Sequence, residues 1–299
     1  VNTNYRSNEL EYLLQQSDST TLLLIGGIRQ PDEFLKVLDR VCPAIKDSEP
    51  GKLNCEKLPF LKNIIYLGKE KMPGMFNWDD ILEIGKSVSD GELKARMDSL
   101  QPDDTINMQY TSGTTGFPKG VMLSHTNLIG NALGMSERMN LSTDDSMCIP
   151  VPFFHCFGCV LGTLTCMVSA ATLAPVVAFS APAVMKTVNA SKCTAILGVP
   201  TMFIAELEEM DKNTYATSHL RTGVMAGSTC PIELMRRVIK EMGANELTIV
   251  YGQTESSPGI TQTLVDDSLE RKTTTVGRAL PNVEVKIVDP GTGQDTPTD

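Results

Sequence analysis

The chain has 299 residues, of which 41% are hydrophobic and 21% are charged. This composition is typical of a folded globular protein with a large core and excludes a disordered one. The net charge is −10 and no block of lysine and arginine occurs, which argues against a dedicated nucleic-acid binder and against a binder of anionic membranes.

Eight cysteines are spread along a long chain whose first residues show no signal-peptide pattern. This usage favours a reducing, cytoplasmic location over a disulfide-rich secreted protein. The apolar runs are short or are broken by Gly, Ser, Thr and Pro. Because a membrane span needs about 20 uninterrupted apolar residues, no integral membrane segment is expected.

Short apolar strands alternate with amphipathic helices along the chain. In the first part, the pattern predicts strands at 21–27, 63–68, 105–111 and 120–125, and helices at 9–16, 31–42, 77–85 and 126–139. Further on, it predicts strands at 147–151, 171–177, 194–198, 221–225 and 246–250, and helices at 156–168, 181–191, 200–210 and 231–242. Pro231 is expected at the first helical position of the last of these. The final forty residues lack a helical pattern, and 283–289 alternates as a strand.

Repeated βα units predict an α/β fold with mainly parallel sheets that are covered on both faces. We expect two layered βα subdomains, a partial first one at 1–140 and a second at 141–265. The β-rich segment 266–299 is expected to begin a small barrel. In such folds ligands bind beyond the carboxyl ends of the strands, where the loops gather.

The segment YTSGTTGFPKGVMLSH, from Tyr110 to His125, surrounds one lysine with small and hydroxylated residues. Its glycines let successive backbone N–H groups point at one anion. Its hydroxyls add donors and Lys119 adds a positive charge, an inventory that suits a polyphosphate. The spacing is not that of the usual NTPase loop, because Pro118 precedes Lys119 and Gly120 follows it. A glycine-rich surface turn is the alternative.

The string YTSGTTGFPKG (110–120) resembles the phosphate-loop signature of the adenylate-forming, or AMP-binding, enzymes, and YGQTE (251–255) resembles their second signature. Four further segments have counterparts in that superfamily: VPFFHCFG (151–158), GVPTMF (198–203), MAGSTCP (225–231) and TVGRALPNVEVKIVD (275–289). The similarity covers essentially the whole chain and looks closest to medium- and long-chain fatty acyl-CoA synthetases. It implies a ligase that uses ATP to convert a fatty carboxylate to an acyl-adenylate and pyrophosphate, and then forms acyl-CoA and AMP.

The resemblance assigns the β- and γ-phosphates of ATP to the residues of the loop: Thr111, Ser112, Gly113, Thr114, Thr115, Gly116 and Lys119. In the second signature, Tyr251 would stack on adenine beside Gly252, and Thr254 would bind the α-phosphate. Glu255 would help to hold Mg²⁺, which prefers oxygen ligands and keeps waters. A solvated surface acid is the alternative for Glu255.

The segment Ala226, Gly227 and Ser228 matches the loop that packs against adenine, with a plain turn as the alternative. By the same resemblance, His155 matches a histidine or aromatic residue that lies where the acyl, phosphate and thiol paths meet in the family, although a lone histidine among apolar residues is often a packed core residue. The candidate catalytic residues are therefore Lys119, His155, Thr254 and Glu255.

Cys156, Cys159 and Cys166 follow His155 in a C-x-x-C-x₆-C spacing. A zinc site is one interpretation. Cysteines in an apolar helical run are more often buried small hydrophobes, and we favour that interpretation.

The expected partners are small molecules: a fatty carboxylate, ATP with Mg²⁺, and CoA. A transfer of the acyl group to a carrier protein or another acceptor is an alternative, as is a non-catalytic nucleotide-binding module. Acyl chain length and a homodimer are left open. The chain resembles a central part of the family's large domain, without the ribose-binding motif and the C-terminal lid domain. Residues 1–299 alone are therefore expected not to complete the overall reaction at a normal rate.

Overall fold

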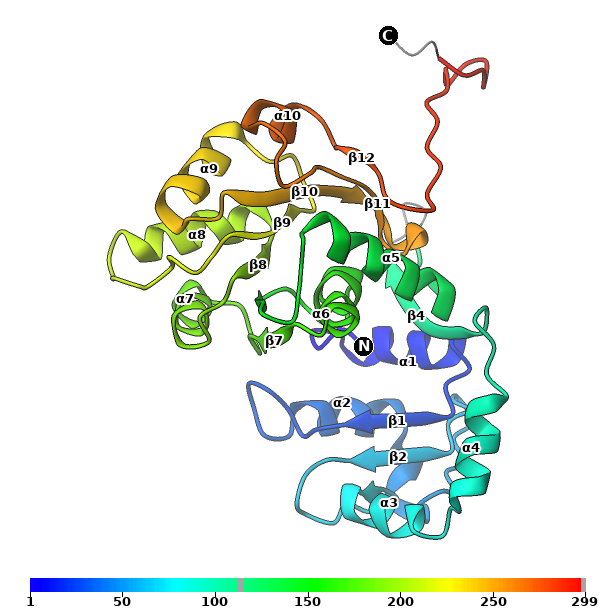
Figure 1. The fold of residues 1–299 in the computed structure, drawn as a ribbon. Helices are drawn as coiled ribbons and strands as arrows, with labels where there is room; N and C mark the ends of the chain where they lie inside the picture. Colours follow the sequence, from blue (N-terminus) through cyan, green and yellow to red (C-terminus); the bar gives the residue numbers. More distant parts are fainter. Residues whose placement is uncertain (112–115, 297–299) are drawn as a thin grey trace. The chain divides into compact units, whose positions relative to one another are not determined.

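The computed structural model describes residues 1–111 and 116–296, which belong to two compact units, 1–101 and 102–299 (Figure 1). The first unit holds a parallel sheet in the order β1-β2-β3, with Thr21 of β1 opposite Asn63 of β2. Its strands are β1 (Thr21–Leu24), β2 (Asn63–Tyr66) and β3 (Phe76–Asn77). Its helices are α1 (Ser7–Gln16), α2 (Glu33–Val41), the 3₁₀ turn η1 (Pro43–Asp47), α3 (Trp78–Gly85) and α4 (Asp90–Asp98).

The second unit is built on a seven-stranded sheet in the order β12-β11-β10-β9-β8-β6-β7. The strands from β10 to β7 are parallel, and β11 and β12 add antiparallel pairs at one edge. These strands are β6 (Ser146–Ile149), β7 (Thr172–Pro175), β8 (Ala195–Gly198), β9 (Thr222–Ala226), β10 (Glu246–Gly252), β11 (Gly259–Gln262) and β12 (Arg278–Ala279). A separate antiparallel hairpin pairs β4 (Thr105–Thr111) with β5 (Lys119–Ser124).

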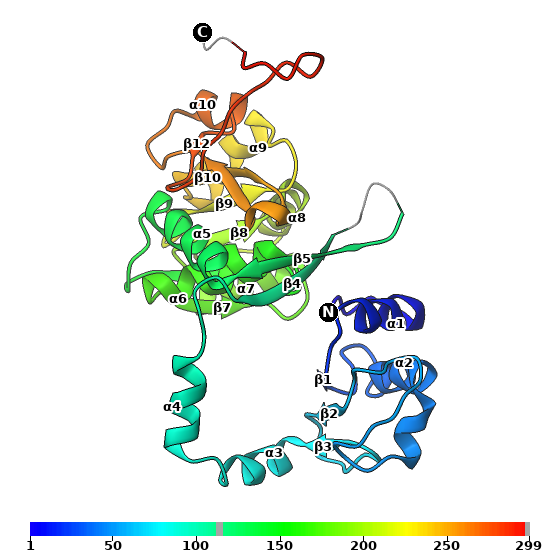
Figure 2. The same ribbon diagram turned by 90° about the vertical axis from the view of Figure 1, so that its right-hand side faces the viewer.

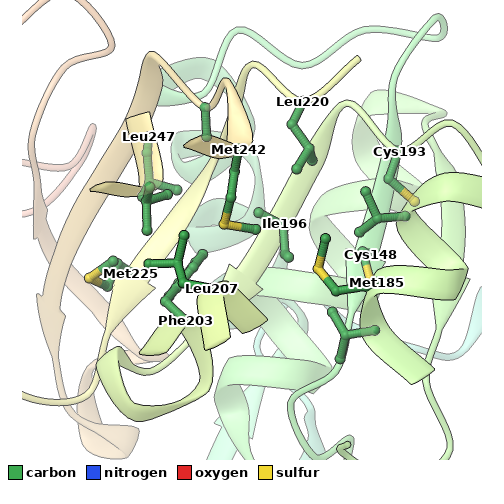
Figure 3. Packing of buried hydrophobic residues seen from close by; sticks show 14 of the residues in the cluster. Cys148, Met185, Cys193, Ile196, Phe203, Leu207, Leu220, Met225, Met242 and Leu247 are labelled. Atoms are coloured by element: carbon green, nitrogen blue, oxygen red, sulfur yellow. The ribbon is translucent and has the colours of Figure 1, made fainter. Parts of the chain in front are cut away.

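Helices cover both faces of the seven-stranded sheet. On the face that carries Cys148, Ile196 and Met225, the apolar side chains pack against α7 (Ala181–Ala190), α8 (Pro200–Met210), α9 (Ile232–Arg237) and the π-helical η3 (Val238–Met242) (Figure 3). On the opposite face they pack against α5 (His125–Arg138), the π-helical η2 (Phe157–Leu164) and α6 (Thr165–Ser169). Neighbouring strand residues alternate between the two cores because successive side chains of a strand point to opposite faces. The predicted α/β class with mainly parallel sheets is confirmed.

Besides the short strands β3, β11 and β12, which were not predicted, four local features differ from the sequence analysis. Helix α10 (Leu269–Thr274) lies in the tail, where no helix was predicted; Ser268 caps it by accepting a hydrogen bond from the Arg271 N–H. Residues 283–289 form no strand, and Val288 makes only a single antiparallel bridge, to Asp295. A strand needs a paired neighbour to satisfy its backbone groups, and the alternating pattern alone does not supply one.

The other two differences are in helices. Pro231 is the residue before the first turn of α9 rather than its first residue, because its backbone is extended (ψ 136°). Helix α4 was not predicted at all. Within the described part of the chain, no helix combines the length and apolar character that crossing a membrane requires. The start of a barrel in the tail stays a prediction.

Candidate active site

The carboxyl ends of β9 and β10 bring two of the predicted segments side by side. The strands are parallel neighbours, with Ala226 opposite Val250. The loop that starts at Gly227 therefore leaves the sheet at the same edge as Tyr251. Ala226 is buried, whereas Gly227, Ser228 and Tyr251 are exposed. This edge thus offers an accessible aromatic ring beside an accessible backbone loop.

The second-signature loop, residues 251–258, is closed on itself by short-range hydrogen bonds. The Gln253 N–H donates to the Pro258 carbonyl at 3.0 Å, and the Ser256 hydroxyl lies 2.7 Å from the same oxygen and 2.8 Å from the Gln253 carbonyl. A Cβ at Gly252 would lie 1.9 Å from the Pro258 oxygen, so only glycine fits there. The loop presents Thr254 half-buried and Glu255 exposed, in the 3₁₀ turn η4 (Thr254–Ser256).

His155 reaches this edge of the sheet from another strand. It lies in the connection that follows β6, just before η2. Its Nδ1 accepts a hydrogen bond from the Phe157 N–H at 3.1 Å, so the neutral ring carries its proton on Nε2. The ring has an exposed side, but partial burial still lowers the pKa of His155 because desolvation disfavours the charged form. His155 is therefore a neutral donor through Nε2 at neutral pH.

The cysteine after His155 lies near the second-signature loop. Burial, with the neighbouring Cys159, raises the pKa of the Cys156 thiol to about 12, so the group is neutral. The Thr254 hydroxyl lowers that pKa and the Glu255 carboxylate raises it. Sequence reasoning treated Cys156 as a small core residue, and only its adjacency to His155 hinted at the site.

The phosphate-loop hairpin supplies the remaining predicted residues (Figure 2). Thr111 and Lys119 face each other across the two strands, and β5 packs beside η4. Ser112, Gly113, Thr114 and Thr115 lie outside the described residues. Gly116 and Lys119 are exposed. Lys119 thus belongs to the hairpin and not to the sheet edge where His155, Thr254 and Ser228 lie.

Metal binding at this site depends on Glu255. Among the described residues, no group of three or more His, Cys, Asp or Glu side chains could hold a metal ion. One exposed carboxylate nevertheless fits Mg²⁺, which is usually bound by one or two carboxylates together with substrate phosphates and waters.

A doubly covered parallel sheet with exposed loops at its carboxyl edge is the arrangement in which α/β proteins bind small ligands. A model of the AMP-binding enzyme family matches residues 1–299. The chain belongs to the AMP-binding enzyme family.

Individual relatives agree with this membership. The chain is 54% identical over 295 residues to YngI of Bacillus subtilis, a protein named as an acyl-CoA synthetase, and the match covers 99% of this chain and 54% of that protein. It is 36% identical over 304 residues to the mitochondrial medium-chain acyl-CoA ligase ACSF2 of Mus musculus, and this match covers 99% of this chain and 49% of that protein. The chain thus spans about half the length of these relatives.

Solved structures share the fold. The anthranilate CoA ligase AuaEII in complex with anthranoyl-AMP is similar with a TM-score of 0.81 and 21% identity, over 99% of this chain and 52% of that one. A long-chain-fatty-acid-CoA ligase, FadD1 from Archaeoglobus fulgidus, is similar with a TM-score of 0.76 and 23% identity, over 99% of this chain and 55% of that one. At such identities the likeness concerns the fold alone.

Proposed function

We propose that the protein containing this chain is an AMP-forming acid–thiol ligase that activates a fatty carboxylate with ATP and transfers the acyl group to CoA. The observation that carries the proposal is the meeting of three separate segments at one sheet edge in a member of the AMP-binding family. These segments contain Ser228, Tyr251 with Thr254, and His155. The names of the relatives, an acyl-CoA synthetase and a medium-chain acyl-CoA ligase, support the same reaction class.

The first step needs positioning and charge neutralisation more than proton transfer. A carboxylate is already ionised at neutral pH, so it attacks the α-phosphorus of ATP without a general base and expels pyrophosphate. Donors that meet the charge developing on the phosphate oxygens lower the barrier. Lys119 would neutralise the outer phosphates, and the Thr254 hydroxyl would donate to the α-phosphate. Glu255 would hold Mg²⁺, whose charge lowers the cost of bringing the carboxylate to the triphosphate.

The adenine and acyl ends would bind at opposite sides of that centre. Tyr251, which is 52% exposed, offers an accessible ring for stacking beside the loop at Gly227. The segment from Val151 to Leu164 carries no aspartate that could hold an α-ammonium group. Its apolar side chains suit a plain alkyl carboxylate. Neutral His155 would donate from Nε2 where the carboxylate and the thiol meet the phosphate.

Isotope exchange between ATP and pyrophosphate tests this proposal on the full-length protein, with octanoate and palmitate as substrates. We expect exchange that depends on the fatty carboxylate, and acyl-CoA and AMP when CoA is added. Exchange without acyl-CoA would point to another acceptor, such as a carrier protein. No exchange with any carboxylate would contradict the proposal and favour a nucleotide-binding module.

A further inference from the structure

Helix α5 starts at the base of the phosphate-loop hairpin and is bonded to both ends of that hairpin. It follows β5 directly, and Ser124, the last residue of β5, caps it by accepting a hydrogen bond from the Asn127 N–H at 3.2 Å. Thr126, in the first turn of α5, reaches the chain just ahead of β4. Its N–H and its hydroxyl donate to the Pro102 carbonyl at 2.9 and 3.0 Å. The start of α5 is therefore part of the hairpin base.

A buried amide farther along α5 pairs with the backbone at the start of β11. The Nδ2 of Asn131 donates to the Gly259 carbonyl at 2.8 Å, and its Oδ1 accepts from the Gly259 N–H at 3.0 Å. The side chain of Asn131 is 7% exposed, and Gly259 is buried. Because a buried backbone group without a partner costs free energy, these two hydrogen bonds hold Gly259 against the helix.

Gly259 closes the second-signature loop. It lies opposite Gly252 in the β10–β11 pairing, and it follows Pro258, whose carbonyl accepts a hydrogen bond from inside the loop. The space around Gly259 is tight, since a Cβ there would lie 2.8 Å from Leu280 Cδ1 and 3.2 Å from the Met135 sulfur of α5. Gly259 therefore cannot shift without also shifting α5 or the second-signature loop.

We propose that α5 holds the second-signature loop at a fixed position relative to the phosphate-loop hairpin, and that Asn131 is the positioning residue that makes this connection. The inference rests on the proposed function only for the identity of the ligand, which is ATP. Lys119 of the hairpin and Thr254 of the loop would then meet the outer phosphates and the α-phosphate of the same molecule. A fixed arrangement of the two segments lowers the entropy cost of aligning these groups on the triphosphate.

The test compares Asn131→Leu and Asn131→Asp in the full-length protein with the matched control Arg138→Met. Arg138 lies farther along α5, and its Nη2 donates to the Ala279 carbonyl of β12 at 2.9 Å. The control thus also removes a hydrogen bond from α5 to strand backbone, but at a strand that pairs with β11 beyond Gly259. Two quantities are measured for each variant: amide hydrogen-exchange protection of residues 251–259, and kcat and KM for ATP in ATP/pyrophosphate exchange.

Asn131→Leu removes both hydrogen bonds to Gly259. We expect faster exchange of the Gly259 amide and of the loop amides. We also expect kcat/KM for ATP to fall by about 10- to 100-fold, since a misplacement of about 1 Å has an effect of this size. KM for the carboxylate should change little, because the loop serves the ATP site. Arg138→Met should keep the wild-type loop protection and KM for ATP, even if it lowers the melting temperature.

Asn131→Asp keeps the shape of the side chain but adds a group that titrates. A protonated carboxyl can accept from the Gly259 N–H and donate to the Gly259 carbonyl, whereas an ionised one can only accept. Protection of the Gly259 amide, taken relative to an unstructured chain at the same pH, should therefore be close to wild-type at pH 5 and lower at pH 8. Wild-type protein and Arg138→Met should not show this change.

The inference is overturned if Asn131→Leu keeps wild-type loop protection and KM for ATP, or if Arg138→Met alters the loop as much. Protection in Asn131→Asp that does not change with pH would overturn it as well. If neither Asn131 variant folds, the wild-type protein decides: its Gly259 amide should exchange as slowly as the buried middle of α5, and a fast Gly259 amide overturns the inference.

A failure of the proposed function would look different. Wild-type protein without any ATP/pyrophosphate exchange would contradict that function, and the hydrogen-exchange measurements would still decide whether α5 holds the second-signature loop through Asn131.

Discussion

Glu206 on α8 is a carboxylic acid enclosed in an apolar core. It is fully buried beside Phe203 and Leu207, and neither of its carboxylate oxygens has a hydrogen-bond partner among the described residues. Burial raises the pKa of Glu206 from 4.5 to about 8, because the charged form cannot be solvated there. The folded protein therefore holds this group protonated at neutral pH, whereas the unfolded chain would ionise it.

Replacing Glu206 should stabilise the protein, and more so at higher pH. A pKa that is raised on folding means that the folded state binds the extra proton, so stability is lost as the pH rises from about 4.5 through about 8. At pH 7 this loss amounts to about 3 kcal/mol. Urea unfolding at pH 5.5 and pH 8 should show a gain for Glu206→Met that grows with pH. The exposed neighbour Glu208 provides the control Glu208→Met, and an identical gain at both pH values for Glu206→Met would contradict the prediction.

The ring of His155 should make activity sensitive to acid. Partial burial lowers its pKa below 6.5, so protonation occurs only in more acidic solution. A proton on Nδ1 would face the Phe157 N–H donor and break that hydrogen bond, which turns the ring away. We expect the adenylation rate of the full-length protein to fall only in solution more acidic than the ordinary histidine pKa of 6.5 and to recover as the pH rises.

The control for this prediction is His155→Asn, which keeps a polar side chain that does not titrate. Its rate should be lower than that of the wild-type protein, by about 10- to 100-fold for a lost donor near the reacting groups, and flat across the same pH range. Initial rates of pyrophosphate release between pH 5 and 8 measure both profiles. If the rate of His155→Asn still falls at low pH as that of the wild-type protein does, another group is responsible for the loss.

At the scale of secondary-structure elements, one ion-pair network ties the amino ends of several strands together. Arg221, just before β9, donates to Asp145 at 2.8 Å and pairs with Glu246 of β10 at 2.6 Å. The Thr194 hydroxyl, just before β8, donates to Asp145 at 2.7 Å. Burial by itself would raise the pKa of Asp145, but the hydrogen bonds from Arg221 and Thr194 outweigh it and hold that pKa below 3.8. The network lies at the edge opposite the candidate site.

Asp145→Asn should therefore destabilise the protein by about 3 kcal/mol at pH 7, since it removes the buried carboxylate to which Arg221 and Thr194 donate hydrogen bonds. A pKa lowered on folding contributes stability that is present above pH 3.8 and is lost as the pH falls through the folded value. Denaturant unfolding measures the difference. The exposed neighbour Asp144 gives the control Asp144→Asn, which should change stability little, and equal effects of the two substitutions would refute a role for the network.

Two elements show where sequence patterns fall short. Helix α4 has no buried residue, so it lacks the apolar stripe that predicts a helix. Its signal is the Ser89–Glu92 capping box, in which the Ser89 N–H donates to the Glu92 carboxylate at 2.9 Å and the Glu92 N–H donates to the Ser89 hydroxyl at 3.2 Å. Residues 283–289 show the opposite case. Their sequence alternates as a strand does, but in the described tail no neighbouring strand pairs with them, so they form none.

At the scale of the whole molecule, two large apolar cores among the described residues lie inside residues 102–299. The seven-stranded sheet and the helices on its two faces therefore bury their apolar surface without residues 1–101. Burial of apolar surface is the dominant favourable contribution to folding. The second unit thus has the physical requirements of an independently folding domain.

Residues 102–299 expressed alone should consequently unfold in one cooperative thermal transition. Circular dichroism at 222 nm and near-ultraviolet signals from the aromatic side chains measure it. A chain that retains helical signal but shows no cooperative transition and no near-ultraviolet structure would contradict the prediction. Residues 1–101 alone, with a three-stranded sheet, serve as the comparison.

The sequence by itself determined the family, the α/β class and the positions of most strands and helices. Those features depend on local patterns: the hydroxyl- and glycine-rich loop around Lys119, the YGQTE segment, and the alternation of strand and helix periods. Only the tertiary structure decided that Cys156 lies near the second-signature loop and that Asn131 pairs with Gly259, 128 residues away along the chain. Such contacts depend on which strands become neighbours in the sheet, and β-sheet neighbours are set by packing over the whole molecule rather than by any local pattern.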